Sequence, residues 1–305
     1  MQSRRDHTGM IGLLSALALV VIPAGVSAAD ALDWPRASES RSSPATMSDG
    51  AETEIGETAL ENPWENHLET DRDSYTPSTR TVDKGRWIVE SSYSFIDNRH
   101  VAETHSFPEL LLRYGLTERI ELRLGGNYEV GGEGNEVSGG QGAEGFGAGQ
   151  LVQETQLLYG IKARLRNQDA WLPESSLILQ GHTPTSGPNP ATAFTAAYVF
   201  GWELPKEWKL DSAIRYGVDK EQADRFEAWS PSIVLRKTLA ERWNVHAEYF
   251  GKFSQNKQPN FILHFFSPGV HYLVTPNMEV GLRVGWGLNE QTPPFFSNAG
   301  VGVRF

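Results

Sequence analysis

From Arg86 onward the chain alternates apolar and polar residues with a period of two, which is the pattern of a half-buried β-strand. In the first such stretch, Trp87 and Val89 alternate with Arg86 and Glu90. The pattern predicts about twelve strands, near residues 87–95, 110–116, 120–128, 157–163, 175–183, 192–204, 208–216, 227–239, 243–249, 261–273, 278–286 and 296–305. An even number of such strands predicts an all-β fold, a closed antiparallel transmembrane β-barrel.

The connections between these segments fall into two classes that alternate along the chain. Short turns are expected at 116–119, 204–207, 239–242 and 274–277, with a longer one at 167–174. Longer polar loops are expected at 97–104, 130–150, 185–191, 219–226, 254–260 and 288–295. Bacterial outer-membrane barrels carry short turns on the periplasmic rim and long loops on the other. Both ends of the predicted barrel then lie in the periplasm.

Aromatic residues concentrate near both ends of the predicted strands. Trp87, Trp208 and Trp243 open strands, whereas Tyr128 and Tyr249 lie toward the opposite ends. This placement favours two aromatic girdles at the membrane interfaces. A water-soluble β-sandwich is the alternative, with its apolar faces buried and its charges in water. The barrel reverses this, because its apolar side chains face outer-membrane lipid and its charged side chains face the lumen.

The last strand ends on an apolar residue with no polar tail. It has to pair with the first strand, because lipid cannot satisfy an open sheet edge. Its alternation and its final phenylalanine resemble the C-terminal signal that the barrel-assembly machinery reads. Val301, Val303 and Phe305 are therefore the expected assembly signal, and that machinery is an expected partner.

The segment before the barrel has two parts. Residues 1–28 combine a basic start, an apolar run of about a dozen residues and small residues near Ala28, which predicts a secretory signal peptide. Residues 29–84 are acidic and poor in apolar residues, so we expect a flexible periplasmic segment. Its last part, Glu69–Gly85, could instead be held against the barrel. The barrel itself is expected over residues 85–305.

Composition excludes several classes of function. The net charge of −11 disfavours a nucleic-acid partner, which requires a basic face. The chain has no cysteine, which removes disulfides, thiolate metal sites and a cysteine nucleophile. No cluster of ligands predicts a metal site, and no cofactor is expected.

Two parts of the chain carry a more specific likeness. Residues 69–90 and 107–125, together with 247–251 and 268–289, are similar to the family of outer-membrane transporters assigned to the meta-cleavage pathway of phenol degradation. The likeness covers roughly residues 69–305. It implies a barrel of this size that moves hydrophobic or aromatic solutes, and it transfers no binding or catalytic residue. The usual Asp-Arg-Pro start of the family reads Asp-Arg-Asp here, a small departure.

Ten charged residues share the predicted inward face of the strands. A neutralising salt-bridge network and a ladder of charge that selects solutes both fit this set. The strongest candidates for a gate residue are Arg113, Arg123 and Glu248. The full set of lumen-lining candidates is Glu90, Glu109, Arg113, Glu121, Arg123, Arg164, Arg215, Glu248, Arg283 and Arg304.

The glycine-rich stretch 131–149 lacks the GK[ST] ending of a phosphate-binding loop. We expect a mobile extracellular loop, with inward folding into the pore as the alternative.

An enzyme is the less favoured interpretation. A barrel-embedded lipid hydrolase would use a serine and a histidine, and the candidates are Ser232, Ser267, His246, His264 and His271. No G-x-S-x-G or H-E-x-x-H motif supports such chemistry, so no catalytic residue is assigned. The sequence therefore predicts an outer-membrane channel for passive movement of small hydrophobic or aromatic solutes. A plugged structural or adhesion barrel, which binds a partner through its long loops, is the second interpretation.

Overall fold

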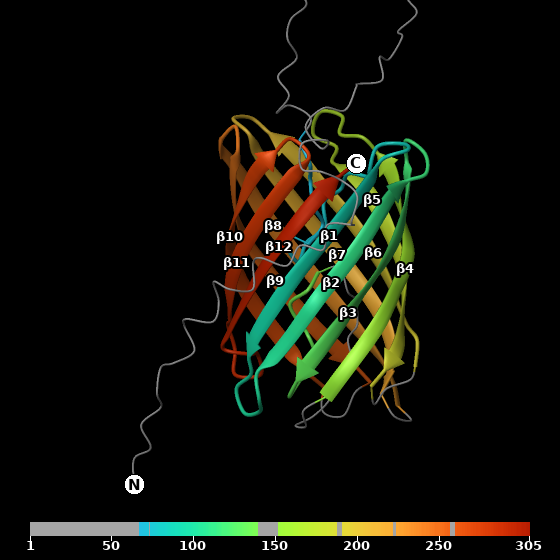
Figure 1. Cartoon of the computed structure of the whole chain (residues 1–305), viewed down its shortest axis with the longest axis vertical. Coiled ribbons are helices and arrows are strands. Elements are labelled where there is room, and N and C mark those ends of the chain that lie inside the picture. Colours follow the sequence, from blue (N-terminus) through green and yellow to red (C-terminus); the bar gives the residue numbers. More distant parts are fainter. Residues whose placement is uncertain (1–66, 73, 140–151, 188–190, 222–223, 257–259) are drawn as a thin grey trace, which may run out of the picture. The chain divides into compact units, whose positions relative to one another are not determined.

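The computed structural model describes residues 67–305 except 73, 140–151, 188–190, 222–223 and 257–259; the predicted signal peptide and residues 29–66 lie outside this part. Twelve antiparallel strands form a closed barrel in which each strand pairs with its neighbours in sequence (Figure 1). The strands are β1 (Trp87–Asp97), β2 (Thr104–Gly115), β3 (Ile120–Gly131), β4 (Val152–Arg166), β5 (Glu174–Ser186), β6 (Ala193–Leu204), β7 (Trp208–Glu221), β8 (Asp224–Ala240), β9 (Trp243–Gln255), β10 (Ile262–Thr275), β11 (Met278–Gly287) and β12 (Phe295–Arg304). The predicted fold is confirmed.

The barrel closes through its first and last strands. The β1–β12 register runs from Ile88 opposite Arg304 to Asp97 opposite Phe295. Trp87 and Phe305 exchange backbone hydrogen bonds of 3.2 and 2.8 Å. The terminal phenylalanine is thus part of the seam, and no edge is left for lipid to satisfy.

The two rims differ as the connection lengths predict, with one exception. The turn rim carries the C terminus, uppermost in Figure 1, and the connections β2–β3, β4–β5, β6–β7, β8–β9 and β10–β11. The opposite end of the barrel, which we call the loop rim, carries the remaining connections between strands. The prediction of a long loop at 219–226 was wrong, because β7 extends to Glu221 and β8 begins at Asp224. Polar residues suggested a loop there, yet Lys220 pairs with Arg225 in a continuing ladder.

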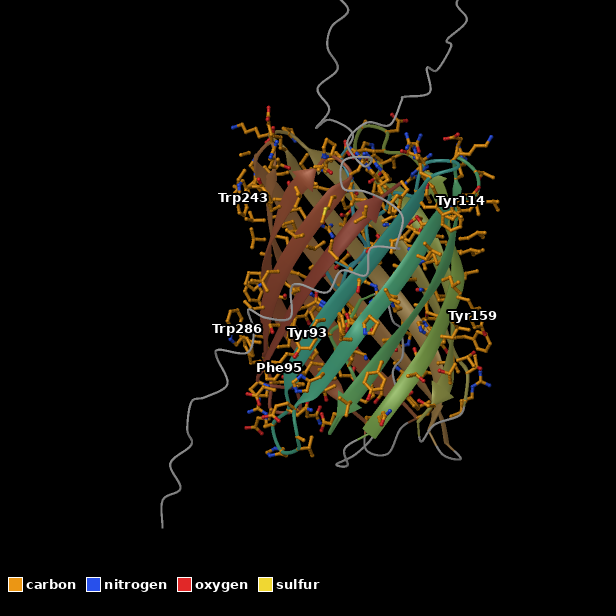
Figure 2. The ribbon with its side chains drawn as sticks, viewed as in Figure 1. Tyr93, Phe95, Tyr114, Tyr159, Trp243 and Trp286 are labelled. Atoms are coloured by element: carbon orange, nitrogen blue, oxygen red, sulfur yellow. The ribbon has the colours of Figure 1, made fainter. Side chains whose placement is uncertain are left out.

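The outer face of the strands is an apolar belt. Trp87 packs against Tyr114, and Trp243 against Tyr272, in cross-strand pairs near the turn rim, with ring centroids 4.3 and 4.7 Å apart. Figure 2 shows Trp243 and Tyr114 toward the turn rim, and Trp286 toward the other end. Such a belt with aromatic ends is the surface that a bilayer covers. Among the described residues, no helix is long and apolar enough to cross a membrane.

This belt predicts a depth-dependent response to charge. Ile214 is 46% exposed in the middle of β7. Its replacement by arginine should cost about 2–4 kcal/mol of folding free energy, because the charge enters the bilayer centre. Leu204→Arg at the turn rim should cost about 0–1 kcal/mol. Urea-titrated folding into lipid vesicles measures both. Small, equal costs for the two variants would indicate a surface that faces water.

Candidate functional site

The lumen of the barrel is occupied by its own N-terminal segment, residues 67–84, which we call the lumen plug. The plug enters at the turn rim, where the Leu68 amide donates to the Pro276 carbonyl at 3.0 Å. It returns to the same rim, where Lys84 forms a bridge with Gly115 at the end of β2. Between these points it turns back around Tyr75, which is 3% exposed. Over residues 69–84 the structure thus agrees with the alternative in which the last part of this segment is held against the barrel, and differs from a flexible segment.

Short-range hydrogen bonds stabilise the reversal of the plug. The Ser74 hydroxyl donates to the Thr76 carbonyl at 2.7 Å, and the Ser78 amide donates to Asp71 Oδ1 at 3.0 Å. Serine and aspartate side chains favour such local contacts in turns. Ser74 and Thr76 have no exposed surface, so protein fills the barrel around the tip.

A cluster of charges anchors the middle of the plug to the barrel wall. Asp71 Oδ2 lies 2.6 Å from Arg123 Nη1, 3.1 Å from Lys162 Nζ and 3.7 Å from Arg113 Nη2. Glu121 of β3 accepts hydrogen bonds from both arginines at 2.8–2.9 Å. All five side chains are buried. The plug therefore supplies a carboxylate to a wall that is rich in cations.

Carboxylates of β1 and β2 hold the next part of the plug. Glu90 Oε2 accepts from the backbone amides of Asp71 and Arg72 at 2.9 and 3.0 Å. The Arg72 guanidinium donates to the Leu110 carbonyl at 2.7 Å and lies 3.6 Å from Glu109. Here the charge relation is the reverse of that at Asp71, because the plug brings the cation and the wall the anion.

Glu248 of β9 holds the tip of the plug. Its carboxylate accepts from the Tyr75 amide at 2.9 Å and from the Thr76 hydroxyl at 2.7 Å. Arg283 of β11 lies 3.5 Å from the same carboxylate. The Tyr75 ring stacks on Phe250, with centroids 4.2 Å apart and planes 6° apart.

The contact with Phe250 belongs to an apolar area on the otherwise polar wall, which we call the inner aromatic patch. It consists of Phe250, Phe265 and Phe296 with Ile96 and Leu263, all buried. The rings of Phe250 and Phe265 stack at 4.6 Å. By parity these residues face inward, so the patch lies on the lumen side rather than in the lipid belt.

A second segment enters the lumen from the loop rim. Residues 132–139, which we call the inner loop, are the described start of the glycine-rich β3–β4 connection. Asn135 and Ser138 donate to Glu109 on β2, and Lys252 pairs with Glu136. Val137 packs in the inner aromatic patch. The described part of this connection thus folds inward; residues 140–149 lie outside the described residues.

The inner loop and the plug meet inside the barrel. A Cβ at Gly139 would lie 2.2 Å from the Tyr75 carbonyl oxygen, so only glycine permits this approach. Arg215 donates to the Gly139 carbonyl, and Arg283 to the Val137 carbonyl. The two segments close the barrel from opposite rims.

The structure brings most of the predicted lumen-lining residues to this interior. Eight are at most 5% exposed: Glu90, Glu109, Arg113, Glu121, Arg123, Arg215, Glu248 and Arg283. Arg164 and Arg304 are half-buried and lie at the turn rim, where they hydrogen-bond to Glu118 and Asn277. Each of the eight touches the plug or the inner loop or shares an ion pair with a residue that does. A role in solute passage stays a prediction.

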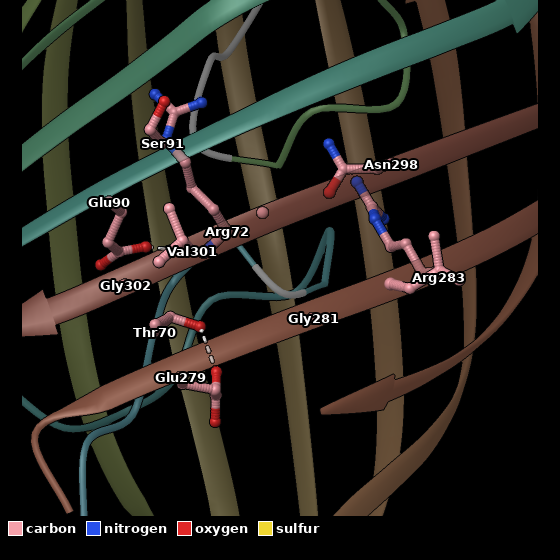
Figure 3. Close-up of a pocket in the computed structure, with 12 residues that line it drawn as sticks. Thr70, Arg72, Glu90, Ser91, Glu279, Gly281, Arg283, Asn298, Val301 and Gly302 are labelled. Carbon is pink, nitrogen blue, oxygen red and sulfur yellow. Dashed lines mark hydrogen bonds between the residues drawn. The ribbon is translucent and has the colours of Figure 1, made fainter. Parts of the chain in front are cut away.

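One interior cavity lies where the plug passes β11 and β12 (Figure 3). It holds about 20 Å³, room for a single water molecule. Thr70 donates to Glu279 across it at 3.0 Å. This cavity is too small for an organic solute.

The histidine and serine candidates do not form a nucleophile pair. His246 Nδ1 lies 2.7 Å from His271 Nε2 inside the barrel, and His264 contacts Tyr249. The Ser267 hydroxyl donates to the Val284 carbonyl at 2.9 Å rather than to a histidine. Within the described residues no group of His, Asp and Glu forms a metal site.

The anchor of the plug predicts an acid-dependent opening. Burial raises the pKa of the Asp71 carboxyl, but the charges of Arg113, Lys162 and Arg123 outweigh this and hold the pKa far below its ordinary value. A carboxyl with a lowered folded-state pKa stabilises fully above its unfolded pKa of about 4 and loses this contribution as the pH falls further. Glu90 and Glu121 face the same cluster.

Planar-bilayer conductance should therefore stay constant from pH 7 to about 5 and rise below about pH 3, as the plug is released. In Asp71→Asn the acid step should shrink, because that carboxyl no longer titrates. A conductance step near pH 6 would contradict this assignment.

The comparisons with known proteins agree with this architecture. The family model described as "Putative MetA-pathway of phenol degradation" matches residues 70–305. The chain belongs to this family. The match starts at residue 70, so the family model includes nearly the whole plug as well as the barrel. No curated protein matches the chain.

Solved structures are similar to this chain to different degrees. An outer membrane channel from Pseudomonas putida F1 has a TM-score of 0.51 at 13% identity, over 75% of this chain and 98% of that one. The NanC porin has a TM-score of 0.44 at 11% identity, over 72% and 98% of the two chains. The KdgM porin has a TM-score of 0.43 at 11% identity, over 72% and 99%. The likeness to the first shows the fold, and with the apolar belt it places this family member in the outer membrane of a Gram-negative bacterium.

Proposed function

We propose that this family member is a gated outer-membrane channel for passive movement of small hydrophobic or aromatic solutes. The observation that carries the proposal is the inner aromatic patch. The lumen wall of a water-filled pore is polar, whereas here three phenylalanines face inward and contact the plug through Tyr75. A solute with an apolar ring would find on this wall the contacts that Tyr75 now makes.

The polar contacts of the plug support a gating role. Apart from Leu68, Tyr75, Pro77 and Val82, its buried residues are held mainly by hydrogen bonds and ion pairs. Water can replace such contacts on both sides when the plug leaves, so the net cost of release is modest. An apolar plug would instead leave a large apolar surface in water. The plug is thus built to be held and released.

Uptake of labelled benzyl alcohol by porin-deficient cells that produce the barrel tests the proposal. We expect a rate above that of cells without the barrel, and a smaller gain for 1,6-hexanediol, which has no ring to stack. Benzyl alcohol uptake equal to that of cells without the barrel would remove the channel function.

The filled lumen also favours the second candidate, a plugged structural or adhesion barrel with no transport. That function predicts zero solute flux together with binding that depends on the loops at the loop rim. Neither candidate is an enzyme.

The proposal includes the barrel-assembly machinery as a partner. Val301 and Val303 are half-buried on the outer face, and Phe305 is 55% exposed at the seam. Deletion of Phe305 should lower the yield of heat-modifiable barrel in outer-membrane fractions several-fold. An unchanged yield would show that the machinery does not need this residue.

A further inference from the structure

The tip of the plug lies in a slot made for one aromatic ring. One face of the Tyr75 ring stacks on Phe250 at 4.2 Å. The Arg215 guanidinium of β7 lies over the ring, 4.9 Å from its centroid. A phenylalanine and a guanidinium are the two surfaces that an aromatic ring binds best, by stacking and by cation–π attraction.

Arg215 differs from the other buried arginines of the lumen. Arg113, Arg123 and Arg283 each lie within 3.5 Å of a carboxylate oxygen. Arg215 is 5% exposed and has no carboxylate partner among the residues that the structure describes. Its Nη2 donates to the Gly139 carbonyl. Its Nη1 has no hydrogen-bond acceptor among the described residues. A buried guanidinium without an anion is costly, so this position favours a ligand that brings one.

We propose that the slot between Phe250 and Arg215 binds an aromatic carboxylate when the plug withdraws. The ring of the ligand takes the place of Tyr75 on Phe250, and its carboxylate accepts hydrogen bonds from Arg215. Tyr75 is then a built-in competitor that fills the slot in the closed barrel. This inference rests on the proposed function and narrows its solute class.

Arg283 is paired with Glu248 beside the slot, so the charge that favours an anion over a neutral ring is that of Arg215. Once Tyr75 leaves, the Arg215 donor atoms and the Phe250 face are presented together. A guanidinium forms strong charge-assisted hydrogen bonds with a carboxylate. A neutral ring would leave the charge of Arg215 uncompensated. The site should therefore prefer benzoate to benzyl alcohol.

Calorimetric titration of the full chain in detergent with benzoate tests the site without measuring transport. Tyr75→Ala should bind benzoate on the order of tenfold more tightly than the native protein, because the competing ring is gone. Tyr75→Ala with Arg215→Gln should lose this gain. Tyr75→Ala with Arg166→Gln should keep it, because Arg166 lies at the turn rim and donates to the Pro173 carbonyl. Heat-modifiability on gels reports folding of each variant.

The other probes separate ring from charge. Tyr75→Ala should bind cyclohexanecarboxylate and benzyl alcohol more weakly than benzoate, because each lacks one of the two groups. Equal benzoate affinity with and without Arg215, or equal affinity for the three probes, would overturn the site. Transport of benzyl alcohol by a barrel that fails these titrations would leave the proposed function standing. Binding without transport would support the site and count against the channel.

Discussion

Removal of the lumen plug should turn the barrel into a steadily conducting pore. A variant in which the exported chain begins at Gly85 retains all twelve strands and loses the segment that fills the lumen from the turn rim as far as Phe250. The wall it leaves is charged and can be hydrated, so water and ions enter. Mean conductance in planar bilayers should rise on the order of tenfold, with the inner loop as the remaining constriction.

A second deletion provides the control for this experiment. Removal of residues 30–60 shortens the chain and leaves residues 67–84 in place, so its conductance should match that of the native protein. If both deletions conduct like the native barrel while folding normally, the plug does not close the pore. If only the deletion of residues 30–60 raises the conductance, the segment that closes the pore lies outside residues 67–84.

Asp71→Asn should release the plug without removing any of it. Three buried cations, Arg113, Arg123 and Lys162, face three buried carboxylates, Asp71, Glu90 and Glu121. The substitution leaves three cations against two anions, 3 − 2 = 1 uncompensated charge. Breaking a buried ion pair from one side costs about 3–5 kcal/mol. Because Asp71 belongs to the plug, release returns both its segment and the wall to water.

Trypsin cleavage within the plug measures this release. Arg72 is 6% exposed in the docked state, so cleavage there reports the open population. The rate in Asp71→Asn should rise by about 10²–10³-fold, the equilibrium shift that corresponds to this energy. Asp83→Asn removes an exposed carboxylate of the same segment and should leave the rate unchanged. Equal cleavage of the two variants would show that the charge cluster does not hold the plug.

The strands could be predicted because each contains its own signal. Along β3, exposed Leu122 and Leu124 alternate with buried Glu121 and Arg123, and the sequence alone gives this parity. The extension of β7 to Glu221 and the start of β8 at Asp224 could not be predicted, since charged residues that extend beyond the membrane look like loop residues. Alternation with a period of two identifies a paired strand only where one face of that strand is apolar.

The docked plug could be given only as an alternative, because its contacts are with distant residues. Asp71 meets Lys162, 91 positions away, and Tyr75 meets Glu248, 173 positions away. Local composition predicts disorder for such a polar segment, and only the wall makes it ordered.

The inward orientation of one member of the inner aromatic patch could also be predicted from the sequence. Phe250 has the parity of His246 and Glu248 and therefore faces inward. The charged members of this face were predicted to line the lumen, whereas the phenylalanine was not. That Phe250, Phe265 and Phe296 form one cluster depends on strand registers, which a single sequence does not determine.

The plug can be locked in place to test whether solute passes only when it moves. A Cβ at Gly302 would lie 3.7 Å from the Thr70 Cβ, near the mean of about 3.8 Å in disulfides, and the chain has no other cysteine. In Thr70→Cys/Gly302→Cys, benzyl alcohol uptake by porin-deficient cells should fall to that of cells without the barrel. It should recover when a reductant opens the bond, and the Thr70→Cys single variant should transport normally. Undiminished uptake through the locked barrel would contradict the account.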